Sequence, residues 1–242
     1  MHTRFFLLIP ACIALSFAQE EQPPNAPPKD QPVNPIKPNL VRLDDSRYQL
    51  GEVIFDRKTR EIRFPAEVHI TDKPTEYAIV HPRGSEHEAI ITTKISPVEL
   101  NLAFTLLRYK PSVELFSLIE ETGHPTGIYP QVPAAIRAAA HIDIDLEWTE
   151  KDILRRVHLS QCFESDRTNK PMVDGPWLYT GEDFGGDIVG MRLNRYAMIN
   201  DIGPDRDEEG SWHPAPNILP PVGTNLTVII SRYTKAIPLQ QY

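Results

Sequence analysis

HIDIDLEWTEKDILRRVH, residues 141–158, carries the clearest structural signal in this chain of 242 residues. From Ile142 to Trp148 every second residue is apolar, and acidic residues occupy the positions between them. This period of two predicts a β-strand with one buried face and one solvated face. The segment from Ile153 to Ser160 is expected to return beside it as the second strand of a hairpin.

The acidic residues of this strand allow two interpretations. They stand at positions 143, 145 and 147, and the expected partner strand carries Arg155, Arg156 and His158. Three carboxylates at spacing two could chelate a cation. Opposite charges on neighbouring strands stabilise a sheet by a few tenths to about 1 kcal/mol per pair, so we favour cross-strand pairing on the solvated face.

Other segments also favour strands. Residues 62–70 alternate in the same way, and Pro65 predicts that this strand lies at a sheet edge or near a bulge, because proline has no N–H for the ladder. A short strand is expected at 52–55, with a hairpin loop at 56–59. Further strands are expected at 76–81, 191–200 and 225–231.

One main amphipathic helix is predicted from Ser96 to Arg108. Ser96 is a suitable N-cap, Pro97 suits the first helical position, and Glu99 completes a capping box. Four of its apolar residues are expected to pack against the strand that carries Phe64 and Val68, namely Val98, Leu102, Ala103 and Leu106.

A second, short helix is expected where Ser85 and Glu88 repeat the capping-box pattern ahead of Ala89. Strands outnumber helices in this set of elements. The predicted fold class is therefore α+β, with predominantly antiparallel sheet and the main and the short helix packed on it.

The amino terminus has the features of an export signal. Arg4 precedes an almost wholly apolar run from Phe5 to Phe17, and small residues stand before a cleavage point after Ala18. We expect residues 1–18 to be a cleaved signal peptide and the mature protein to be periplasmic or extracellular. The alternative is a lipoprotein anchored through Cys12. The run is too short for a transmembrane anchor, which needs about 20 apolar residues.

Seven of the twenty residues from 19 to 38 are proline. Such a polar, proline-rich chain cannot form a core and favours extended conformations. We expect residues 19–45 to be a disordered spacer, followed by a single domain over 46–242.

Charge and cysteine content exclude several classes of function. The chain has 25 Lys and Arg against 33 Asp and Glu, a net charge of −8, and no basic cluster, so nucleic acid is not expected as a partner. After cleavage only Cys162 remains, and it is expected to be a buried apolar residue. An iron–sulfur cluster needs about four cysteine ligands and is therefore not expected. No cofactor is predicted.

Several short motifs resemble the YdjY-type domain family over about residues 47–233. They are Gly51-Glu52-Val53, Phe64-Pro65-Ala66, Glu76-Tyr77, residues 84–88, the helix at 97–107, residues 177–181 and Pro221-Val222-Gly223-Thr224. The resemblance implies an exported bacterial protein of a family without an established activity. The ferredoxin-like label attached to that family needs cysteine clusters, which this chain lacks.

Two places are candidate functional sites. His87 beside Glu88 suits a metal ligand or an acid–base pair, although Glu88 is also explained by the capping box. Trp177 and Tyr179 lie in a segment rich in aromatic residues and glycine, which could present a contact surface or anchor a strand in the core.

We therefore expect a non-catalytic binding or interaction module of the cell envelope, with an unidentified envelope protein as partner. The alternative is an enzyme or metal-binding protein with its site at His87 and Glu88.

Overall fold

The computed structural model describes residues 39–181, 185–203, 206 and 212–235. Every described residue belongs to one compact unit, residues 38–242. The expected signal peptide, Cys12 and most of the expected spacer lie outside the described residues. Strand β1 (Leu40–Arg42) falls within the range expected to be a spacer and pairs with β2 (Arg47–Leu50).

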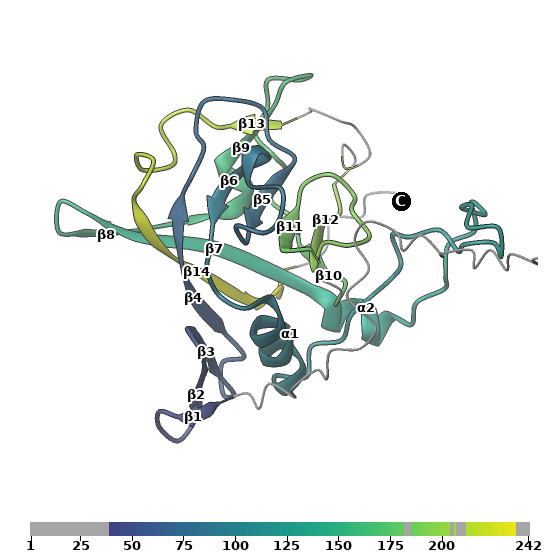
Figure 1. Ribbon diagram of the computed structural model, residues 1–242, viewed down its shortest axis with the longest axis horizontal. Helices are drawn as coiled ribbons and strands as arrows, with labels where there is room; N and C mark the ends of the chain where they lie inside the picture. Colours follow the sequence, from purple (N-terminus) through teal and green to yellow (C-terminus); the bar gives the residue numbers. More distant parts are fainter. Residues whose placement is uncertain (1–38, 182–184, 204–205, 207–211, 236–242) are drawn as a thin grey trace, which may run out of the picture. The chain divides into compact units, whose positions relative to one another are not determined.

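Eight strands close into a barrel (Figure 1), in the order β4, β14, β7, β10, β12, β11, β5, β6 and back to β4. Their bounds are β4 Ile62–Val68, β5 Tyr77–Val80, β6 Ala89–Thr92, β7 His141–Glu150, β10 Trp177–Tyr179, β11 Asp187–Gly190, β12 Ile199–Asp201 and β14 Asn225–Arg232. The α+β prediction is therefore wrong. The domain is mostly β and contains only two small α-helices among its described residues.

Closure depends on β4, which has one partner on one side and two on the other. It pairs with β14 along its length, with β3 (Val53–Asp56) as far as Arg63, and with β6 from Glu67 onwards. Pro65 lies in the gap between the β3 and β6 pairings. The strand is thus central rather than an edge, and the missing N–H of Pro65 costs no ladder bond on that side.

The remaining strands extend this barrel. The pairs β1–β2 and β2–β3 continue outward from β4, and β9 (Phe163–Ser165) pairs with β13 (Trp212–Pro214) in a separate small sheet. Strand β8 (Ile153–His158) pairs antiparallel with β7, so the predicted hairpin is confirmed. The expected strand at 191–200 is wrong for most of its length, because only its last two residues enter β12.

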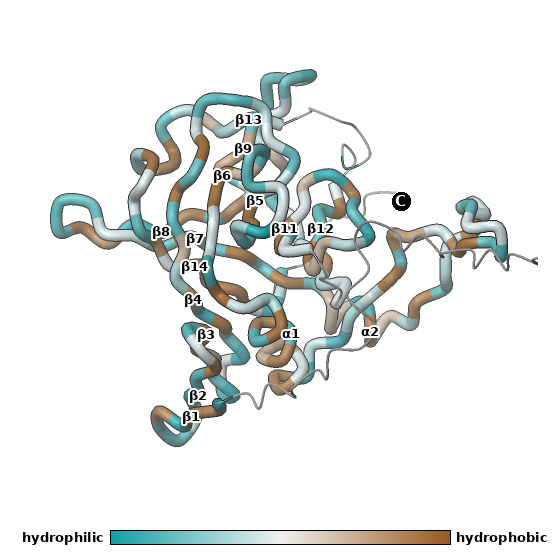
Figure 2. The backbone as a smooth tube through the Cα atoms, in the orientation of Figure 1, coloured by the Kyte–Doolittle hydropathy of each residue, from teal (hydrophilic) through white to brown (hydrophobic). Residues whose placement is uncertain are grey.

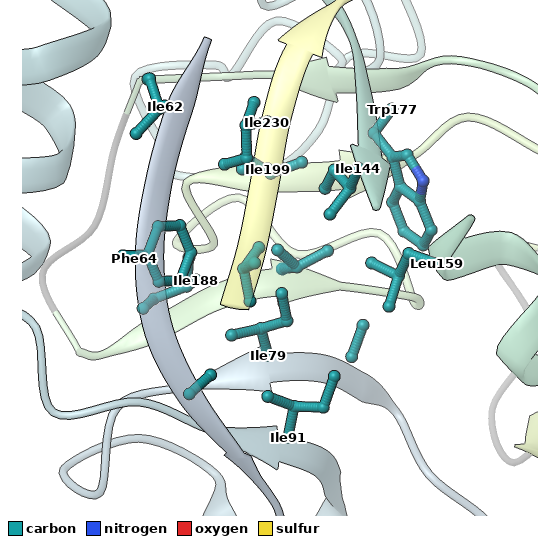
Figure 3. Close-up of a cluster of buried hydrophobic side chains, with 14 of the residues drawn as sticks. Ile62, Phe64, Ile79, Ile91, Ile144, Leu159, Trp177, Ile188, Ile199 and Ile230 are labelled. Carbon is teal, nitrogen blue, oxygen red and sulfur yellow. The ribbon is translucent and has the colours of Figure 1, made fainter. Parts of the chain in front are cut away.

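Each barrel strand contributes apolar side chains to one core (Figure 3). Ile62 and Phe64 of β4 meet Ile144 of β7 and Ile230 of β14, and all four are at least 99% buried. The alternation predicted for β4 and β7 is confirmed, since their inward residues are buried. Cys162 is also fully buried, as expected, and the loss of water contact raises the pKa of its thiol to about 12.

Helix α1 (Pro97–Leu106) starts where the sequence predicts, with the Ser96 hydroxyl accepting a hydrogen bond from the Glu99 N–H. Its buried face differs in part from the predicted one, since Ala103 is buried as expected but Val98 is 68% exposed. Leu100 and Phe104 are fully buried, whereas Leu106 is 41% exposed. The helix carries apolar residues on all of its sides, so its sequence pattern did not identify the side that faces the core.

The prediction of a short second helix is wrong in its extent. Residues Glu86–Glu88 form one 3-10 turn (η1), and Ala89 already begins β6. The Ser85 hydroxyl makes no cap bond to this turn. Instead, the Ser85 N–H donates to Asp187 Oδ1 at 2.7 Å, so the segment is held from β11. Two further short helices were not predicted, α2 (Ala134–Ala140) and the 3-10 turn η2 (Leu159–Cys162).

Among the described residues, no helix is both long enough and apolar enough to cross a membrane.

Candidate functional site

A long excursion of the chain between α1 and α2, residues 112–133, forms what we name the apolar arm (Figure 1). Its two sides pair as a narrow hairpin. The Leu118 N–H donates to the Ile128 carbonyl and the Thr126 N–H to the Leu118 carbonyl, both at 2.8 Å. A β-bridge joins Ile119 and Pro125 beyond them. These bonds give the arm a defined shape outside the barrel.

The arm buries Leu115 and Phe116 at its base but exposes most of its other large apolar side chains. Its exposed large hydrophobic residues are Val113, Leu118, Ile119, Ile128 and Tyr129. Figure 2 shows apolar stretches on both sides of the arm. Single exposed apolar residues are ordinary, but a contiguous group of them marks an interaction surface. The tip adds the exposed acids Glu120 and Glu121.

A pocket of about 440 Å³ lies at the base of the arm. Its lining comes from the arm, from α2 and from the chain after β12, namely Glu114, Leu115, Tyr129, Pro130, Gln131, Arg137 and Arg206. The size suits a small ligand or one or two side chains of a polypeptide.

Glu114 organises the polar wall of this pocket. Its carboxylate, only 10% exposed, accepts a hydrogen bond from Arg137 Nε at 2.6 Å and lies 3.5 Å from Nε2 of the buried His141. Burial raises the pKa of Glu114, but the hydrogen bonds from His141 and Arg137 and their charges outweigh it, so the net pKa is lowered. Glu114 is therefore ionised at neutral pH and orients Arg137.

A second guanidinium lies on the pocket wall. Arg206 Nη1 donates to the Gly203 carbonyl at 3.0 Å, and this hydrogen bond helps to hold the side chain in place. The described lining of the pocket thus contains two guanidinium groups and one carboxylate, and that carboxylate is paired with Arg137. Guanidinium groups suit the recognition of carboxylates, because their fork of N–H donors matches the two oxygens.

The first predicted pair lies elsewhere on the surface. His87 and Glu88 are in η1 with side chains 77% and 42% exposed, and His87 Nε2 is 3.5 Å from Glu88 Oε1. Within the described ranges, no third histidine, cysteine or carboxylate gathers with them as a metal site. The pair remains a prediction without further support.

Trp177 and Tyr179 are both in β10 and are almost fully buried. Tyr179 stacks on Phe104 with ring centroids 4.2 Å apart, and its hydroxyl donates to Asn101 Oδ1. The structure thus places Tyr179 between the barrel and α1. Leu178, the residue between the two aromatics, packs in a different apolar cluster that includes Leu115 of the arm.

The sequence analysis missed the pocket because its residues are far apart in the chain. Glu114, Arg137 and Arg206 share no motif or spacing. One feature of the sequence could have indicated this region. In the arm, large apolar residues occur without the period of a helix or a strand.

Comparisons of the chain with family models, with curated proteins and with solved structures gave no match.

Proposed function

We propose that this protein is an exported, non-catalytic binding module that holds a segment of a partner protein against the apolar arm and the pocket at its base. The observation that carries the proposal is the group of exposed apolar residues on the arm, adjacent to a pocket that contains Arg137 and Arg206. Export is supported by the signal-like residues 1–18, and the partner is accordingly an envelope or extracellular protein.

The chemistry of the pocket supports recognition rather than proton transfer. A general base works best with a pKa near the working pH, whereas the pKa of Glu114 is lowered and its carboxylate is already bonded to Arg137. The paired carboxylate serves to position a guanidinium. The Arg137 side chain is 43% exposed, so a ligand can reach it.

The occupant that fits is an apolar polypeptide segment with an acidic side chain. Its apolar residues would cover Ile128 and Tyr129, and its carboxylate would meet the partly exposed side chain of Arg137 in the pocket. Tyrosine and arginine are the residue types that most often dominate binding energy at protein interfaces.

Selection from a phage library of random dodecapeptides on the immobilised protein tests this proposal. Enriched peptides should combine several apolar residues with one Asp or Glu. Ile128→Ser should weaken the binding of a synthetic selected peptide by about tenfold or more, because the side chain is replaced at the centre of the contact. Arg137→Gln should abolish the preference for an acidic residue.

Leu154→Ser is the matched control. Leu154 is 65% exposed on β8, compared with 62% for Ile128, and lies outside the arm. This substitution should leave peptide binding unchanged. The proposal is overturned if no peptides are enriched, or if Ile128→Ser and Leu154→Ser bind the selected peptide equally well.

A further inference from the structure

We propose that Asp143, His158 and Asp174 form a Zn²⁺ site on the outer face of the barrel, distinct from the arm and its pocket. The three side chains come from β7, from the end of β8 and from the chain between β9 and β10. Each offers one ligand atom, and these atoms all lie within 4.8 Å of one another. No ion is present, so the argument rests on the donors and their neighbours.

The strand geometry explains why only one acid of β7 takes part. Ile142 and Ile144 point into the core, so Asp143 projects from the opposite face. Two residues along, Asp145 accepts from Arg156 Nη2 at 2.7 Å, and Glu147 pairs with Arg63 of β4 at 3.1 Å. The cross-strand pairing expected from the sequence is thus confirmed for Asp145, while Asp143 remains outside it.

The ring of His158 lies beside a carboxylate, as the rings of metal-binding histidines often do. Its Nδ1 lies 2.5 Å from Asp145 Oδ1, and the Asp145 side chain is only 9% exposed. A histidine ligand typically gives one ring N–H to a carboxylate, which fixes the ring and leaves the other nitrogen for the metal. Here Nε2 is the nitrogen left for coordination.

Asp143 is the donor with the greatest need of a cation. It is about half-buried and accepts no hydrogen bond from any described residue. Its carboxylate lies near two others, those of Asp145 and Asp174, and near the side chains of Lys235 and His158. A bound divalent ion would stabilise the ionised carboxylate directly.

Asp174 has a partner that competes with an ion. Lys235 Nζ lies 2.9 Å from Asp174 Oδ2, but both side chains are nearly half-exposed and the pair is therefore readily separated. In the absence of metal the ammonium group neutralises part of the cluster. On metal binding it is displaced into water.

The donor set favours Zn²⁺. Three protein ligands of imidazole and carboxylate type, with a fourth position for water, are typical of open zinc sites. Mg²⁺ and Ca²⁺ prefer oxygen ligands only. Coordination would use the neutral imidazole of His158, as is general for histidine ligands.

Isothermal titration of the purified chain with ZnCl₂ at pH 7.5, in a buffer without chelating groups, tests the site. We expect one Zn²⁺ bound per chain, with Asp143→Asn and His158→Gln each weakening binding by at least about tenfold. Since Asp143 accepts no hydrogen bond, Asp143→Asn should fold normally, as circular dichroism would show. If the His158→Gln variant is unstable, the result for Asp143→Asn alone decides whether the zinc site exists.

His213→Ala is the matched control. His213 also lies against a carboxylate, with Nδ1 2.7 Å from Asp166 Oδ1, but within the described part of the chain it belongs to no cluster of three possible ligands. This variant and His87→Ala should bind Zn²⁺ as the wild type does. Absence of binding, or binding that survives Asp143→Asn, overturns the proposal. Neither result bears on peptide binding at the arm.

Discussion

Replacing Phe104 with alanine should destabilise the domain by about 3–5 kcal/mol, the usual cost of truncating a buried phenylalanine. The side chain is fully buried, stacks on Tyr179 and meets the edge of Tyr109 at a centroid distance of 5.2 Å. Truncation would leave a cavity where α1 joins the barrel. For a domain of this size the midpoint of thermal unfolding should fall by roughly 6–20 °C, at about 2–4 °C per kcal/mol.

Leu106→Ala in the same helix is the internal comparison. Leu106 is 41% exposed, so its truncation removes less buried surface than that of Phe104 and should cost only about 1 kcal/mol. Urea unfolding followed by tryptophan fluorescence gives both free energies, and unchanged m-values would show that the unfolded states are comparable. If the two variants lost similar stability, the packing of α1 described here would be incorrect.

Two further predictions concern buried ionisable groups. Burial raises the pKa of Asp201 to about 6, so on increasing pH the unfolded state loses this proton first and the folded protein loses stability between about pH 4 and 6. Asp201→Asn should remove this loss, so that the free energy of urea unfolding rises by up to about 3 kcal/mol at pH 7 and changes little at pH 4. An equal change at both pH values would contradict this prediction. The Cys162 thiol should not react with Ellman's reagent in the folded protein and should react fully in denaturant, because it is buried and its pKa is about 12. Fast reaction of the native protein would show that the thiol is accessible.

Local chemistry explains which elements the sequence predicted well. The β7–β8 hairpin follows from an alternation that continues over several residues, and the start of α1 follows from Ser96, Pro97 and Glu99. Both signals lie within a few consecutive residues. By contrast, β10, β12 and β9 contain only three residues each, which is too short for a period to be recognised.

The candidate sites show the same division. His87 and Glu88 attracted attention because they are adjacent in sequence, but they lie exposed on a single turn. The pocket and the proposed zinc site combine residues separated by many positions, such as Glu114 with Arg137 and Asp143 with Asp174. No spacing rule relates such residues before the chain folds.

By itself, the sequence determined the alternating strands, the capped start of α1 and the acidic, cysteine-poor composition, because these depend on neighbouring residues alone. Only the tertiary structure decided that the sheet closes, since closure requires β4 to pair with both β14 and β6. It also decided which face of α1 is buried and which polar groups meet. These outcomes depend on contacts between distant segments, whose cooperative packing no local pattern encodes.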